Sequence, residues 1–106
     1  MIISTMNELP GYEITEVLGE VFGLTVRSRN AFSQMGAGLK SLLGGELKGM
    51  TKNLETSREE VIQRMAERAA ERGGNAVLAM RFDTSEMGDV WTELCAYGTA
   101  VKVVKS

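Results

Sequence analysis

The segment TKNLETSREEVIQRMAERAAERGG, residues 51–74, defines the helical layer of the fold. Its apolar side chains recur at three- and four-residue spacing, which predicts one long amphipathic helix over residues 51–72. Glu60 and Arg64 stand in the favourable i,i+4 order on this helix. Gly73-Gly74 provides the left-handed stop that ends many helices. The apolar stripe consists of Leu54, Val61, Ile62, Met65, Ala66, Ala69 and Ala70.

The chain after this helix predicts a β-hairpin. Residues 75–87 and 90–104 are rich in strand-forming side chains, and Gly88-Asp89 between them is typical of a two-residue turn. That turn fixes a register in which Phe82 lies opposite Cys95. One sheet face then holds Leu78, Met80, Phe82, Trp91, Cys95, Tyr97, Val101 and Val103. The other face holds Val77, Ala79, Arg81, Asp83, Leu94, Ala96, Gly98 and Ala100.

The chain before the helix predicts two more strands. Residues 2–5 form a short strand, and residues 12–27 form a long one with a bulge or bend at Gly19 or Gly23. Residues 30–50 have helical periodicity that glycines interrupt.

These elements predict a single domain over residues 1–106. The fold class is α/β (α+β), with two layers, an antiparallel sheet and a long helix packed on it. One helical layer covers only one sheet face. The second face, small and mostly apolar, therefore predicts contact with another copy of the chain.

Composition excludes several classes of function. The chain has 106 residues, no histidine and one cysteine, so imidazole-based catalysis and an intramolecular disulfide are both excluded. Its net charge of -2 gives no reason to bind nucleic acid. No apolar run approaches the length of a membrane helix, and the first ten residues lack the features of a secretory signal. We expect a cytoplasmic protein that is not an enzyme and binds neither nucleic acid nor membrane.

Two arginine-containing segments are candidate ligand sites. Arg81 and Asp83 share a strand face at i,i+2, either as a structural ion pair or as the lining of an anion pocket between subunits, with Glu93 as a third lining residue. Arg27 and Arg29 follow the long strand, where they either bind an anion or pair with the acidic N-terminal strand.

Cys95 is the one candidate ligand for a soft metal ion. A single thiolate without histidine does not complete a metal site within one chain. A symmetric oligomer could repeat the ligand around its axis. The alternative is a buried cysteine that behaves as a small hydrophobic residue.

Five blocks of sequence carry a family resemblance: VFGLTVRSR (21–29), GLKSLLGGE (38–46), GNAV (74–77), MRFDTS (80–85) and AYGTAV (96–101). Together they resemble the YbjQ-like family of small bacterial and archaeal proteins. The resemblance implies a small α/β subunit, dodecin-like in topology, that assembles into a homopentamer. The family carries a heavy-metal-binding label that assigns no ligand residues.

Two hypotheses for the function follow. The first is a homo-oligomeric protein that binds a small anion or a heavy-metal ion at its subunit interfaces. The alternative is a non-catalytic structural or interaction module without a small-molecule ligand. No cofactor is assigned under either hypothesis.

Overall fold

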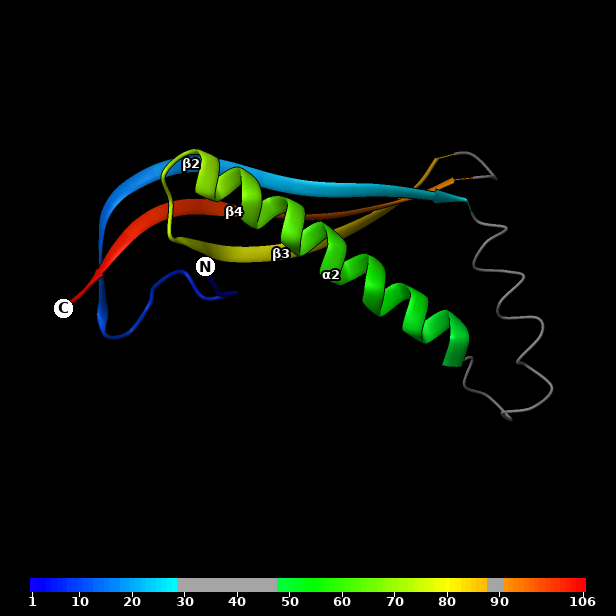
Figure 1. The fold of residues 1–106 in the computed structure, drawn as a ribbon, viewed down its shortest axis with the longest axis horizontal. Helices are drawn as coiled ribbons and strands as arrows, with labels where there is room; N and C mark the ends of the chain where they lie inside the picture. The colour runs from blue at the N-terminus through cyan, green and yellow to red at the C-terminus, as the bar shows by residue number, and fades with distance from the viewer. Residues whose placement is uncertain (29–47, 88–90) are drawn as a thin grey trace.

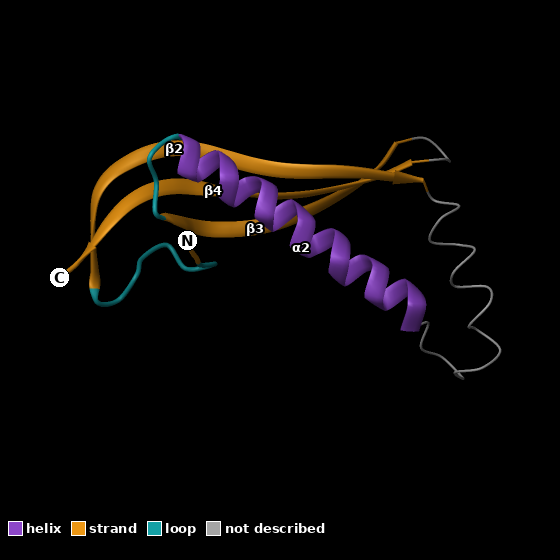
Figure 2. Cartoon of the chain, in the orientation of Figure 1, coloured by secondary structure: helices purple, strands orange, loops and turns teal. Residues whose placement is uncertain are grey.

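The computed structural model describes residues 1–28, 48–87 and 91–106. Within them a four-stranded sheet packs against one long helix, α2 (Lys48–Glu71) (Figures 1 and 2). No helix among these residues has the length and apolarity to cross a membrane. Most of the helical pattern predicted over residues 30–50 lies outside the described residues.

The sheet has the strand order β1-β3-β4-β2. Its long strands are β2 (Tyr12–Ser28), β3 (Ala76–Met87) and β4 (Trp91–Lys105), and β4 pairs antiparallel with both neighbours. The short strand β1 (Ile2–Ile3) pairs parallel to β3, so the sheet is mixed and not purely antiparallel as predicted.

Helix α2 ends as predicted. Gly73 has φ +84°, its N–H donates to the carbonyl of Ala70, and the N–H of Gly74 donates to the carbonyl of Ala69. This pair of bonds is a Schellman motif, which satisfies the last helical carbonyls. The turn sends the chain directly into β3.

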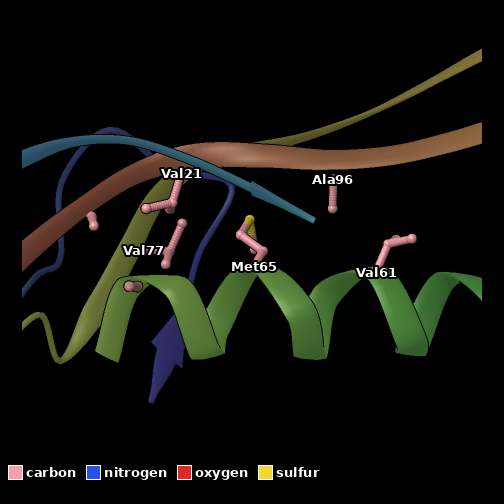
Figure 3. Packing of buried hydrophobic residues seen from close by; sticks show 7 residues of the cluster. Val21, Val61, Met65, Val77 and Ala96 are labelled. Atoms are coloured by element: carbon pink, nitrogen blue, oxygen red, sulfur yellow. The ribbon is translucent and has the colours of Figure 1, made fainter. Parts of the chain in front are cut away.

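The core lies between α2 and the sheet (Figure 3). Val61, Met65 and Ala69 of the helix are fully buried against Val21, Val77, Ala96 and Ala100 of the sheet. The predicted apolar stripe is thus confirmed at its centre, whereas Leu54 and Ala70 near its ends are exposed.

The predicted hairpin register is wrong by one residue. Met87 lies opposite Trp91 and Asp83 opposite Cys95, whereas Phe82 lies opposite Ala96. Three residues, 88–90, therefore lie between the paired residues Met87 and Trp91, whereas the predicted turn has two residues. The predicted turn itself lies outside the described residues.

A β-bulge in β3 changes which side chains share a face. Leu78 lies opposite Thr99 and Arg81 opposite Tyr97, so two residues of β3 oppose one residue of β4. Ala79, inside this bulge, has φ +54°. Because strand side chains alternate, one inserted residue moves all later ones to the opposite face.

The prediction that the small-residue face binds another copy is therefore wrong. Val77, Ala96 and Ala100 of that face are fully buried beneath α2 of the same chain. The residues are small because the helix approaches closely: a Cβ on Gly23 would lie 2.2 Å from the carbonyl oxygen of Val61. In β2, the predicted irregularity occurs as a register shift at Gly19, with φ +96°.

The opposite side of the sheet is covered at one end only. There, Ile2, Leu9 and Tyr12 pack on a second apolar cluster of Ala76, Leu78, Val101 and Val103. Beyond that cluster, large apolar side chains on this side of the sheet are exposed, Val26 at 43% and Trp91 at 49%. We call this uncovered region the far face, and it consists of Phe22, Leu24, Val26, Arg81, Asp83, Ser85, Trp91, Glu93, Cys95 and Tyr97.

Candidate functional site

The far face brings together four of the six predicted site residues. Asp83 of β3 lies directly opposite Cys95 of β4, and Leu24 of β2 lies on the other side of the same cysteine. Glu93 stands two residues before Cys95 on the same face, and Arg81 stands two residues before Asp83. The sequence predicted that Arg81 and Asp83 share a face but placed Cys95 on the opposite one.

Arg81 holds the N-terminal segment and does not bind Asp83. Its guanidinium donates to the carbonyl oxygens of Thr5 at 3.0 Å and Met80 at 2.8 Å. Of the ion pairs between described residues, none joins Arg81 to Asp83. The expected structural ion pair is thus not formed. Arg81 is exposed, so its charge does not need a buried partner.

Cys95 is half-buried and lies in a negative electrostatic environment. Burial raises the pKa of its thiol above the ordinary value, and the carboxylates of Glu93, Asp83 and Glu20 raise it further, against the opposing guanidinium of Arg68. The thiol is therefore protonated at neutral pH, and the surrounding charge favours a cation over an anion.

One chain alone does not complete a metal site in the part of the structure that is described. Residues 1–28, 48–87 and 91–106 contain no group of three or more His, Cys, Asp or Glu side chains that could hold a metal ion. Asp83 and Cys95 are adjacent, but a closed site for a heavy-metal ion needs further ligands.

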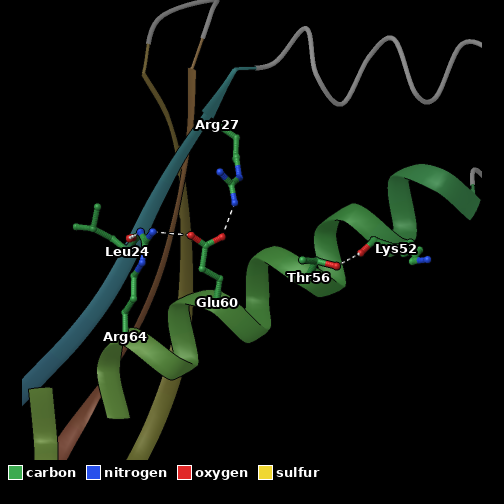
Figure 4. A network of polar contacts seen from close by, with 6 residues as sticks. All are labelled: Leu24, Arg27, Lys52, Thr56, Glu60 and Arg64. Atoms are coloured by element: carbon green, nitrogen blue, oxygen red, sulfur yellow. Dashed lines mark hydrogen bonds and ion pairs between the residues drawn. The ribbon is translucent and has the colours of Figure 1, made fainter. Parts of the chain in front are cut away.

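Arg27 belongs to a different cluster, at the contact between β2 and α2 (Figure 4). It forms an ion pair with Glu60, whose second carboxylate oxygen accepts from Arg64 at 2.5 Å. The predicted partner of Arg27 was the acidic N-terminal strand, whereas the structure pairs it with the helix. Arg29 lies outside the described residues.

The far face also carries exposed apolar side chains. The sequence analysis placed Trp91 and Tyr97 on one sheet face but expected the other face to be the uncovered one. Four large hydrophobic residues there are between 37% and 49% exposed, namely Phe22, Val26, Trp91 and Tyr97. Their signal was the alternation of Phe22, Leu24 and Val26 along β2. It could be used only once the register to β4 was known.

Comparison with known proteins places the chain in a family. A family model named YbjQ_1, with the description "Putative heavy-metal-binding", matches residues 1–104. The chain belongs to the YbjQ family. This confirms the resemblance carried by the five sequence blocks.

Curated relatives named UPF0145 proteins match this YbjQ chain over most of their own length. A UPF0145 protein of Acidothermus cellulolyticus is 65% identical over 103 residues, which are 97% of this chain and 95% of that protein. The UPF0145 protein SCO3412 of Streptomyces coelicolor is 60% identical over 105 residues, or 99% of both chains.

A solved structure shares the fold of this YbjQ chain. It is the crystal structure of a protein of unknown function from Pediococcus pentosaceus, assigned to the DUF74 family. The two superpose with a TM-score of 0.59 over 98% of each chain, at 16% sequence identity. At that identity, the match shows a common fold.

Proposed function

We propose that this protein is a cytoplasmic, non-enzymatic homo-oligomer, pentameric as the family resemblance implies, that binds a heavy-metal ion between its subunits. The far face supports the proposal, because it combines uncovered apolar side chains with a cysteine among carboxylates. The family description is consistent with this ligand class.

Self-association is argued from the apolar side chains of the far face. An antiparallel sheet that faces water normally presents polar residues on that side. Here Phe22, Val26, Trp91 and Tyr97 stand 37–49% exposed on one surface. Fully burying an apolar side chain of this size stabilises by about 1.5–3 kcal/mol. A second copy of the chain is always present in solution and is therefore the partner that we propose for this surface.

Metal binding is argued from the charge around Cys95. The carboxylates of Asp83, Glu93 and Glu20 all raise the pKa of its thiol, so a bound cation would lie in a favourable field. Between the two ligand classes that the sequence left open, this field favours the metal ion. Because Arg81 already donates to two carbonyls, the anion alternative has less support.

Subunit symmetry would supply the ligands that one chain lacks. In a ring whose far faces line the central axis, Cys95 and Asp83 of one copy would lie near those of the next. A thiolate with carboxylate oxygens suits a thiophilic ion such as Cd²⁺ better than a hard ion such as Mg²⁺.

The experiment that tests assembly compares two variants that add the same charge. Tyr97→Glu places a carboxylate on the far face, and Gln63→Glu places one on the exposed outer side of α2. By light scattering coupled to size exclusion, Tyr97→Glu should elute as a smaller species, and Gln63→Glu should match the wild type. Equal masses for all three proteins would refute assembly through the far face.

The experiment that tests metal binding is a Cd²⁺ titration of the wild type and of Cys95→Ser. Binding should disappear in the Ser variant, because the thiolate is the ligand that a soft ion prefers. Retained tight binding would show that carboxylates elsewhere carry the affinity, and it would contradict the assignment to Cys95.

A further inference from the structure

The outer edge of β2 is occupied by a row of three arginines, two in α2 and one directly after its end. β2 is the outermost strand of the sheet on its side. Arg64 donates to the carbonyl oxygen of Leu24 at 2.6 Å, and Arg68 donates to that of Phe22 at 2.9 Å. Arg72 donates to the carbonyl oxygens of both Glu20, at 2.7 Å, and Leu18, at 3.3 Å. We call Arg64, Arg68 and Arg72 the arginine row.

The arginine row follows from the repeat distances of a helix and a strand. Four helical residues rise about 6 Å. Two strand residues rise about 6.6 to 6.8 Å. The arginines are spaced by four along α2 and the residue that follows it, and their acceptors are spaced by two along β2 in the opposite direction. Each step along the helix therefore meets the next outward-facing carbonyl of the strand.

The contacts on either side extend the same alignment. Glu60, four residues before Arg64, reaches the Arg27 side chain farther along β2 (Figure 4). The Arg68 guanidinium also lies 4.6 Å from the centre of the Phe22 ring. Positions 60, 64 and 68 of the helix, and Arg72 directly after its end, thus contact one continuous length of the strand.

Like charges at i,i+4 on a helix repel each other, so three arginines in this spacing need a compensating interaction. The bonds to strand carbonyls provide it, since hydrogen bonds from charged donors are stronger than those between neutral groups. These carbonyls are also the acceptors that an added strand would use.

We infer that the arginine row closes the β2 edge against pairing with a strand of a second copy and so directs self-association to the far face. This inference deepens the proposed function and rests on it for the choice of the far face. Edge closure itself is independent of whether the wild type assembles.

The test removes the arginine row in two backgrounds. One keeps the far face intact, and the other carries Tyr97→Glu, which should prevent assembly through that face. The triple variant Arg64→Ala, Arg68→Ala, Arg72→Ala is made in the wild type and in Tyr97→Glu. A matched control removes three positive charges from other exposed positions, through Lys52→Ala, Arg58→Ala and Lys105→Ala. Mass by light scattering and thioflavin T fluorescence are measured on protein that is folded by circular dichroism.

The arginine variant should form species heavier than its parent, with raised thioflavin T fluorescence, in both backgrounds. The charge control should match its parent. An unchanged mass in a folded arginine variant would overturn edge closure. If the triple variant does not fold, Arg68→Ala alone is compared with Arg58→Ala by the same criteria. Failure of far-face assembly would appear separately, as equal masses of the wild type and Tyr97→Glu.

Discussion

Gly23 is the residue that sets the distance between helix and sheet. A Cβ at this position would lie 2.2 Å from the carbonyl oxygen of Val61 and 2.6 Å from the amide nitrogen of Met65. Both atoms are backbone, so neither can rotate away. Gly23→Ala should destabilise the fold by about 1–3 kcal/mol, the usual cost of overpacking. The free energy of unfolding in urea measures this cost, and Glu13→Ala, at an exposed position, is the control. Equal stability of the two variants would show that the helix is not held this closely.

Ser57 is buried in α2 with a hydroxyl that has no hydrogen-bond partner among the described residues. Ser57→Ala should stabilise the protein by about 1 kcal/mol, because an unsatisfied polar group leaves the core and alanine is the better helix former. The neighbouring Thr56 is exposed and donates to the carbonyl oxygen of Lys52, so Thr56→Ala is the matched control. A lower melting temperature for Ser57→Ala would mean that the hydroxyl is paired in solution.

The Cys95 thiol should ionise at a higher pH than an ordinary cysteine thiol. Its pKa is raised, so reaction with a disulfide reagent should have its midpoint at a higher pH than reaction of a free cysteine. Asp83→Asn with Glu93→Gln should lower that midpoint only in part, because burial is the largest cause of the shift. A midpoint at or below that of free cysteine would contradict the negative field at this site.

Protonation of this thiol also gives metal binding a pH dependence. A bound ion displaces the thiol proton, so affinity should rise by about tenfold per pH unit below the thiol pKa. Cd²⁺ titrations at successive pH values measure this slope. An affinity independent of pH would show that Cys95 is not a ligand.

At the scale of elements, the bulge in β3 determines which side chains reach the far face. Ala79 has φ +54°, a conformation that glycine adopts freely and β-branched residues resist. Ala79→Gly should be at least as stable as the wild type, and Ala79→Val should lose about 1–3 kcal/mol. Thermal unfolding of the two variants measures the difference. A Val variant as stable as the Gly variant would mean that the bulge relaxes easily.

Helix α2 could be predicted from the sequence because its signals are local. The spacing of Val61, Met65 and Ala69 and the stop at Gly73-Gly74 lie within a few turns of each other. The register of β3 could not be predicted in this way. Ala79 carries no turn signal of its own, and the bulge is fixed by pairing with β4 and by the bond from its N–H to Met6.

The candidate site, too, could be predicted only where it depends on local spacing. The i,i+2 spacing placed Arg81 and Asp83 on one face correctly, since that relation is local. The adjacency of Asp83 and Cys95 depends on the register between two strands, so it could not be obtained from either strand alone. The arginine row could not be predicted for the same reason. Its acceptors are backbone carbonyls 40 or more residues away in the sequence, at Leu24, Phe22, Glu20 and Leu18.

Over the molecule as a whole, the described residues give a sheet with one face covered by the helix and the other covered at one end only. The helix covers one side, the arginine row closes the β2 edge, and the far face retains apolar side chains around Cys95. We propose that copies of the chain meet through this face and hold a metal ion there.

Native mass spectrometry of untagged protein prepared with Cd²⁺ tests both parts of this proposal at once, because it reports the number of copies and the retained ions together. We expect a homo-oligomer, five copies as the family resemblance implies, that retains Cd²⁺ in the wild type. Cys95→Ser should keep the oligomer and lose the ion, and Tyr97→Glu should yield smaller species. A wild-type protein that is monomeric and free of Cd²⁺ would refute assembly and metal binding together.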